Sequence, residues 1–125
     1  MVATDVKTVL IVEDDLDIRE ALSQVLEFEG YPVATAVNGE EALKYLANSE
    51  PPGLILLDLM MPVMDGWQFR LEQKKHPEWS QIPVVIVSAD GQVGQKAASI
   101  GASGYLKKPV ELDTLLDTVA QYCGK

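Results

Sequence analysis

The sequence has 125 residues, the usual size of one domain, so we expect residues 1–125 to form a single unit with a core over about residues 7–123. Hydrophobic residues make up 47% of it and charged residues 23%, as in ordinary globular proteins, and the net charge of −9 argues against a nucleic-acid surface because phosphates would be repelled. The sequence predicts a cytoplasmic protein, because no apolar run reaches the roughly 20 residues that cross a bilayer, no signal-peptide pattern opens the chain, and the single cysteine, Cys123, cannot form an internal disulfide.

The first part of the chain alternates predicted strands with predicted helices. Thr8–Val12 is a β-branched apolar run without polar alternation, which is typical of a strand buried on both faces. From Leu16 onward the apolar residues recur with a helical period, and Gly30 stands where a left-handed C-cap is expected. Residues 31–36 are a second predicted strand, and residues 40–47 are a second predicted helix.

The rest of the chain continues this alternation with three more strands and three more helices. The predicted strands are residues 54–57, 84–87 and 105–106, and the predicted helices are residues 67–75, residues 91–100 and a last helix with Leu112, Leu115, Leu116 and Val119 on one stripe. Pro77 ends the first of these helices, and Gly91 and Gly94 weaken the second by up to about 1 kcal/mol each. The pattern predicts an α/β fold, with a doubly wound sheet of five parallel strands and helices on both faces.

Polar residues follow the predicted strands at the edge where such sheets bind ligands. Glu13, Asp14 and Asp15 follow the first strand, and Asp58, Ser88 and Lys108 follow three of the others. Carboxylates gathered at one edge repel one another unless a cation lies among them. Because the set contains oxygen ligands and no histidine or cysteine, it favours Mg²⁺ over zinc.

These residues also suffice for phosphoryl transfer. Mg²⁺ bound by Asp14 and Asp58 would neutralise a phosphoryl group passing onto an oxygen of Asp58. Lys108 would supply a cation, and Ser88 a hydroxyl donor, for the remaining phosphoryl oxygens. A carboxylate nucleophile that forms an aspartyl phosphate is known chemistry, so Asp58 is the predicted phosphoacceptor.

Four segments resemble the receiver domain of response regulators in two-component signalling systems. They are residues 9–15 (VLIVEDD), 56–62 (LLDLMMP), 85–89 (VIVSA) and 101–109 (GASGYLKKP). They follow the order and spacing of that family, and the likeness covers nearly the whole chain. The chain resembles either a free-standing receiver of the chemotaxis type or a receiver excised from a longer protein. The resemblance implies the flavodoxin-like strand order 2-1-3-4-5.

The resemblance also implies a role for individual residues at the metal and phosphoryl site. Asp58 matches the phosphoacceptor. Mg²⁺ would be bound by Asp14, Asp58 and the main-chain carbonyl of Met60, and Glu13 would reach it through water. Three consecutive acids leave a choice of pair, and Arg19 selects Asp14, because the family's common arginine falls five residues after the metal-binding acid. Asp15 then stands at the helix start, where a carboxylate suits the helix dipole.

The resemblance further implies a switch. Lys108 matches the phosphate-binding lysine, and its bond to Pro109 is expected to be cis. Ser88 matches the hydroxyl that turns toward the phosphoryl group, and Tyr105 the aromatic side chain that follows it. Partners would dock on the face formed by residues 91–100, the strand at Tyr105 and the last helix.

The predicted function is therefore that of a phosphoacceptor switch rather than an enzyme. The expected partners are a histidine kinase or phosphotransfer protein and a downstream target or effector domain, with no direct binding to nucleic acid or membrane. One alternative is a pseudo-receiver, a docking module that is not phosphorylated, although such modules usually lack an acid or the lysine that this chain keeps. A Mg²⁺-dependent aspartyl-phosphate phosphatase of the haloacid dehalogenase type would need an acid at position 60, which is Met60. A flavodoxin-like FMN carrier is a further alternative, but the three acids at residues 13–15 would repel the phosphate of FMN.

Overall fold

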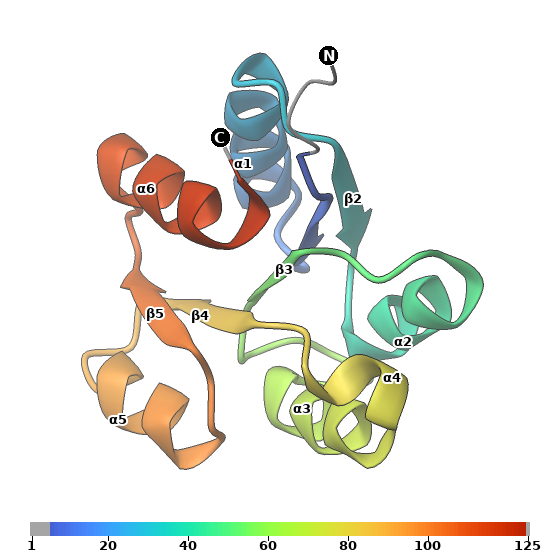
Figure 1. Ribbon diagram of the computed structural model, residues 1–125. Helices are drawn as coiled ribbons and strands as arrows, with labels where there is room; N and C mark the ends of the chain where they lie inside the picture. The colour runs from blue at the N-terminus through green and yellow to red at the C-terminus, as the bar shows by residue number, and fades with distance from the viewer. Residues whose placement is uncertain (1–5, 125) are drawn as a thin grey trace.

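The sheet contains five parallel strands in the order β2-β1-β3-β4-β5, which confirms the predicted architecture and strand order (Figure 1). The computed structural model describes residues 6–124, so part of the N-terminal segment that was inspected for a signal peptide lies outside the described residues. The strands are β1 (Val9–Val12), β2 (Val33–Ala36), β3 (Leu54–Leu57), β4 (Val84–Ser88) and β5 (Gly104–Lys107). The helices are α1 (Leu16–Phe28), α2 (Gly39–Asn48), α3 (Gly66–Lys75), α4 (Pro77–Ser80), α5 (Val93–Ser99) and α6 (Leu112–Cys123).

Helices cover both faces of the sheet, with α1 and α6 on one side and α2, α3, α4 and α5 on the other (Figure 1). Every residue of β1 and β3 is buried. Because successive side chains of a strand point to opposite faces, Leu10 and Val12 pack in the layer of α2, α3 and α5, whereas Val9 and Ile11 pack in the layer of α1 and α6. Each of these apolar strands therefore contributes side chains to both hydrophobic cores.

Polar caps fix where several helices begin. Asp15 is the N-cap of α1, and its side chain accepts a hydrogen bond from the Ile18 N–H at 3.0 Å. Asp65 forms a capping box with Gln68 at the start of α3. Gly30 has a φ of 94° just after α1, so the predicted left-handed C-cap is confirmed.

The structure corrects the prediction at the start of β2, which begins at Val33 rather than residue 31, around Pro77 and at the start of α5. Pro77 does close α3, but it also begins α4, a one-turn helix that the sequence analysis did not predict. Proline suits the first position of a helix because its missing N–H would have no partner there, so the described residues contain six helices rather than five. The helix predicted over residues 91–100 begins only at Val93, and Gly91 lies in the preceding turn.

Helix length and the state of the single cysteine can both be read from the structure. None of the helices within residues 6–124 is long and apolar enough to span a membrane. Cys123 is a buried free thiol on α6, and its burial raises its pKa to about 11. Cys123 is therefore part of the packed core, as a small apolar residue would be.

Candidate functional site

The carboxyl ends of the central strands bring the predicted acids together. The backbone pairing of β1 with its neighbours continues past the last strand residue, because the Glu13 N–H donates to the Ala36 carbonyl and the Asp58 N–H donates to the Val12 carbonyl, both at 3.0 Å. Since Val12 is in register with Leu57, the next residues along each strand, Glu13 and Asp58, are neighbours at the sheet edge. The sheet thus fixes the spacing of these two carboxylates.

Three carboxylates form one cluster at this edge. Oxygens of Glu13, Asp14 and Asp58 all lie within 4.8 Å of one another. Glu13 and Asp58 are buried, with 3% and 7% of their surfaces exposed, whereas Asp14 is exposed. Lys108 completes the cluster, because its Nζ lies 2.8 Å from Oε1 of Glu13 and 3.9 Å from Oδ1 of Asp58. The structure therefore brings together four of the residues singled out in the sequence.

The cluster contains more negative than positive charge. Burial and the neighbouring charge of Glu13 raise the pKa of Asp58 to about 7, although Lys108 and the Met60 N–H act in the opposite direction. The ammonium of Lys108 is thus insufficient to keep the pKa of Asp58 at its ordinary value. A further cation among these oxygens would restore the ionised form of Asp58.

The donor set fits Mg²⁺. All three side chains offer carboxylate oxygens, and the exposed Asp14 leaves a side open to the water molecules that Mg²⁺ usually retains. Asp15, the third consecutive acid, is outside the cluster because its carboxylate caps α1. Of the three consecutive acids, Glu13 and Asp14 are thus the two whose carboxylates lie beside Asp58, and their role as a metal-binding pair stays a prediction.

Met60 and Gly66 shape the loop that follows Asp58. The Met60 N–H donates to Oδ1 of Asp58 at 3.3 Å, whereas metal binding by the Met60 carbonyl stays a prediction. A side chain at Gly66 would lie 2.6 Å from the main-chain oxygen of Asp58, so only glycine permits this close packing. The role of Gly66 was not predicted, although its place after Asp65 at a helix start was a usable signal.

Arg19 also has a structural role that the sequence analysis missed. Its Nη1 donates to the main-chain carbonyls of Glu13 and Asp14, at 2.9 and 3.3 Å. Arg19 therefore holds the backbone of the acidic pair from one turn along α1. The five-residue spacing between Asp14 and Arg19 in the sequence is consistent with this contact.

Ser88 and Tyr105 lie on the same face of the sheet. Ser88 pairs with Lys107 and Ile86 pairs with Tyr105, so the two switch candidates are diagonal neighbours on adjacent strands. Ser88 is buried, and its Oγ accepts a hydrogen bond from the Asp90 N–H at 3.1 Å.

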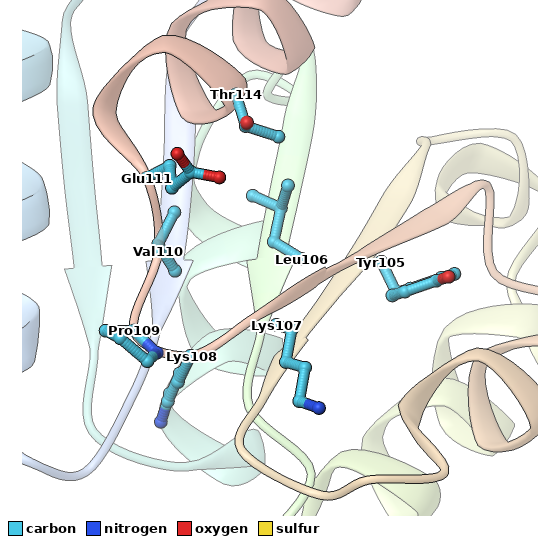
Figure 2. A pocket seen from close by; sticks show the side chains of 8 residues that line it. All are labelled: Tyr105, Leu106, Lys107, Lys108, Pro109, Val110, Glu111 and Thr114. Carbon is cyan, nitrogen blue, oxygen red and sulfur yellow. The ribbon is translucent and has the colours of Figure 1, made fainter.

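The Tyr105 ring points outward, with 53% of its surface exposed. Figure 2 shows the ring directed away from Lys108, whose bond to Pro109 is cis, as predicted. Lys108 and Tyr105 both line a shallow pocket along β5 and the start of α6, together with Leu106, Lys107, Pro109, Val110, Glu111 and Thr114 (Figure 2).

Comparisons with known proteins agree with this geometry. Residues 9–120 match the family described as the response regulator receiver domain. The response regulator MprA of Mycobacterium sp. (strain KMS) is 36% identical over 110 residues, which cover 86% of this chain and 46% of that protein. The chain thus spans about half the length of the curated relatives it matches.

Solved structures show the same likeness. The chemotaxis response regulator CheY4 of Vibrio cholerae superposes with a TM-score of 0.84 at 31% identity, covering 94% of this chain and 98% of that one. The signal receiver domain of a signal transduction histidine kinase from Syntrophus aciditrophicus gives a TM-score of 0.83 at 31% identity, covering 93% and 89% of the two chains.

Proposed function

Because the chain belongs to the family of response regulator receiver domains, we propose that Asp58 accepts a phosphoryl group in a Mg²⁺-dependent reaction and that this changes how the protein binds its partners. The observation that carries the proposal is the cluster of Glu13, Asp14 and Asp58, whose oxygens lie within 4.8 Å of one another beside Lys108. A structural cluster would be expected to balance its charge, and this one does not.

The residues of the site have separate roles in the transfer. An Asp58 oxygen attacks the phosphorus, the bond from phosphorus to the donor breaks, and the electron pair leaves with the donor, which is an imidazole nitrogen of a histidine protein or the acetate of acetyl phosphate. Bound Mg²⁺, held by Asp14, Asp58 and the Met60 carbonyl with Glu13 through water, would supply positive charge to the phosphoryl oxygens.

Lys108 and Ser88 act on the transferred group. The Lys108 ammonium lies 3.9 Å from Asp58 and would pair with a phosphoryl oxygen, giving up its 2.8 Å contact with Glu13. The Ser88 hydroxyl, at the end of the adjacent strand β4, would donate to another. These two residues bind the product state and thereby favour the transfer.

The biological setting follows from this chemistry. We propose that the protein is a phosphoacceptor switch rather than a turnover enzyme, that its phosphoryl donor is a histidine kinase or histidine phosphotransfer protein, and that it acts in the cytoplasm. The buried free thiol of Cys123 is compatible with a reducing compartment. The downstream partner, a target protein or effector domain, would dock on the face of α5, β5 and α6.

Acetyl phosphate with Mg²⁺ tests the proposal directly. Intact-mass measurement should show one added phosphate on the parent protein and none on Asp58→Asn. The matched control is Asp65→Asn, because asparagine also caps a helix and this substitution should leave labelling intact. Equal labelling of Asp58→Asn and the parent would refute the assignment, and a parent that takes up no phosphate would favour a docking module.

A further inference from the structure

Helix α5 is held in different ways at its two ends. At the C-terminal end, Arg70 of α3 donates from Nε to the Ile100 carbonyl at 3.0 Å and from Nη2 to the Gly101 carbonyl at 2.7 Å. Arg70 is buried, with 9% of its surface exposed. These contacts are shielded from water and join the last turn of α5 to a neighbouring helix, so this end is firmly fixed.

At the N-terminal end Val93 packs in the core, but the side-chain polar contacts lie near the surface. Gln92 is the N-cap of α5, and its side chain makes no capping hydrogen bond. Asp90 takes over this function, because its Oδ1 accepts from the Gln92 N–H at 2.7 Å and its Oδ2 forms an ion pair with Lys96. The side chains of Asp90 and Lys96 are each 36% exposed, so this pair is more easily disrupted than the Arg70 contacts.

Asp90 also joins this surface pair to the functional site. Its main-chain N–H donates to the Ser88 hydroxyl oxygen at 3.1 Å. Ser88 is thus tied to the turn before α5, and the turn is tied to the helix by the Asp90–Lys96 pair. A movement of the Ser88 oxygen toward Asp58 must lengthen this bond or move the turn.

The position of Tyr105 identifies which state these contacts stabilise. The ring points outward and lies against Gly94 on α5, where an added methyl group would lie 3.2 Å from its Cε1. In the switch that the family resemblance implies, the ring would follow Ser88 toward the phosphoryl group, and here it points outward. The contacts of Asp90 belong to the arrangement that precedes phosphorylation.

We propose that Asp90 and Lys96 form a latch that holds Ser88 and the turn before α5 in the unphosphorylated arrangement. The latch opposes binding of a phosphoryl group at Asp58, and the Arg70 contacts make the C-terminal end of α5 the fixed end about which the helix moves. This inference rests on the proposed function. It assigns Asp90 and Lys96 as positioning residues that act through Ser88.

Beryllofluoride with Mg²⁺, which mimics a phosphoryl group, provides the test. Lys96→Met removes the ammonium but keeps most of the side chain, so it should tighten beryllofluoride binding by about two- to five-fold, the range expected for an exposed ion pair. The amide and ring NMR signals of Tyr105 in the free variant should also shift toward their positions in the beryllofluoride complex. Lys75→Met is the matched control, since it removes a similar exposed pair with Glu72 on α3, and it should change neither quantity.

A double-mutant cycle separates the latch from a general effect of charge. Asp90→Asn keeps an acceptor for the Gln92 N–H and should have the same effect as Lys96→Met, and the double variant should bind no more tightly than either single variant. The difference between parent and Lys96→Met should shrink as NaCl is raised, because salt screens an exposed pair.

The possible outcomes separate the two proposals. Unchanged or weaker beryllofluoride binding by Lys96→Met, with a parent that binds normally, would overturn the latch and leave the function intact. A parent that binds no beryllofluoride in the presence of Mg²⁺ would count against the proposed function itself.

Discussion

Two polar clusters in this protein differ in the balance of their charges, and this difference separates a structural role from a functional one. In the first, Arg70 donates to two carbonyls and to Oε1 of Gln73, while Nε2 of Gln73 donates to the carbonyls of Trp79 and Ile82. In the second, Glu13, Asp14 and Asp58 face Lys108. The first cluster is neutral except for one guanidinium surrounded by acceptors, and the second contains three acids and one base.

The difference explains what each cluster does. Gln73 is completely buried, and each of its polar atoms has a partner, so the first cluster stabilises one arrangement of α3, α4 and the end of α5. The second cluster keeps Asp58 at a raised pKa of about 7 and leaves Asp14 exposed. Excess charge at a position fixed by the sheet marks a site that is completed by a ligand. Substitutions in the two clusters should therefore have opposite effects on stability.

The largest effect is expected at Gln73. Gln73→Ala removes the partner of Arg70 and of two carbonyls inside the core, and each buried group left without a partner costs about 1–3 kcal/mol. We expect the free energy of unfolding to fall by about 3 kcal/mol, measured by urea denaturation. Gln95→Ala, at an exposed position on α5, is the control and should change stability little. A loss below about 1 kcal/mol at Gln73 would mean that the first cluster does not stabilise the fold as argued.

The second prediction concerns pH and the charge of Asp58 in metal-free protein. Asp58 ionises near its ordinary pKa of about 3.9 when unfolded but near 7 in the native state, so between these values the native protein holds a proton that the unfolded chain has lost. The stability from this group is therefore complete below about pH 4 and is lost as pH rises through about 7.

Urea denaturation in EDTA measures this effect. The free energy of unfolding of the parent minus that of Asp58→Asn should fall between pH 4 and 7, by on the order of 2 kcal/mol. Saturating Mg²⁺ should flatten the trend, because a cation favours the ionised carboxylate. A difference that does not depend on pH in EDTA would show that the acids of the second cluster do not repel one another as inferred.

The third prediction concerns the metal. At about ten times its dissociation constant, Mg²⁺ should stabilise the parent by about 1.4 kcal/mol and raise its Tm by several degrees. Asp14→Ala should abolish this rise in thermal denaturation, because it removes the exposed member of the donor set. Asp17→Ala, an acid in the first turn of α1, should keep it. A normal Mg²⁺ response in Asp14→Ala would remove this acid from the metal site.

The sequence predicted the second cluster well and the first not at all. Glu13, Asp58 and Ser88 each end a strongly apolar strand, and parallel strands bring their carboxyl ends to one edge, so their proximity follows from local patterns. Arg70 and Gln73 lie on a helix with little apolar periodicity, and their partners are main-chain carbonyls that no residue type reveals. Such contacts depend on how separate elements pack together.

The same reason accounts for the errors near α4 and α5. One turn of helix beginning at Pro77 has too few residues to show a period, so the sequence indicated only that α3 ends. The start of α5 depends on Asp90, which caps the Gln92 N–H and pairs with Lys96. The switch roles of Ser88 and Tyr105, by contrast, came from the family resemblance, and the structure adds only their positions.

The smallest effect is expected at Gly94 of α5, which lies against the Tyr105 ring. Alanine is preferred over glycine within a helix by up to about 1 kcal/mol, but the new methyl group would lie 3.2 Å from Cε1 of Tyr105. Because the Tyr105 ring is 53% exposed, it can yield by a few tenths of an ångström, so we expect Gly94→Ala to gain only about 0.5 kcal/mol in the free energy of unfolding. The ring would be displaced from its outward position, and its NMR signals should move toward those of the beryllofluoride complex.

Gly91→Ala is the matched control, since an added methyl group there has no neighbour within 4 Å, and it should leave the Tyr105 signals unchanged. Equal shifts in both variants would mean that the backbone at the start of α5, rather than contact between the added methyl group and the ring, controls the position of Tyr105.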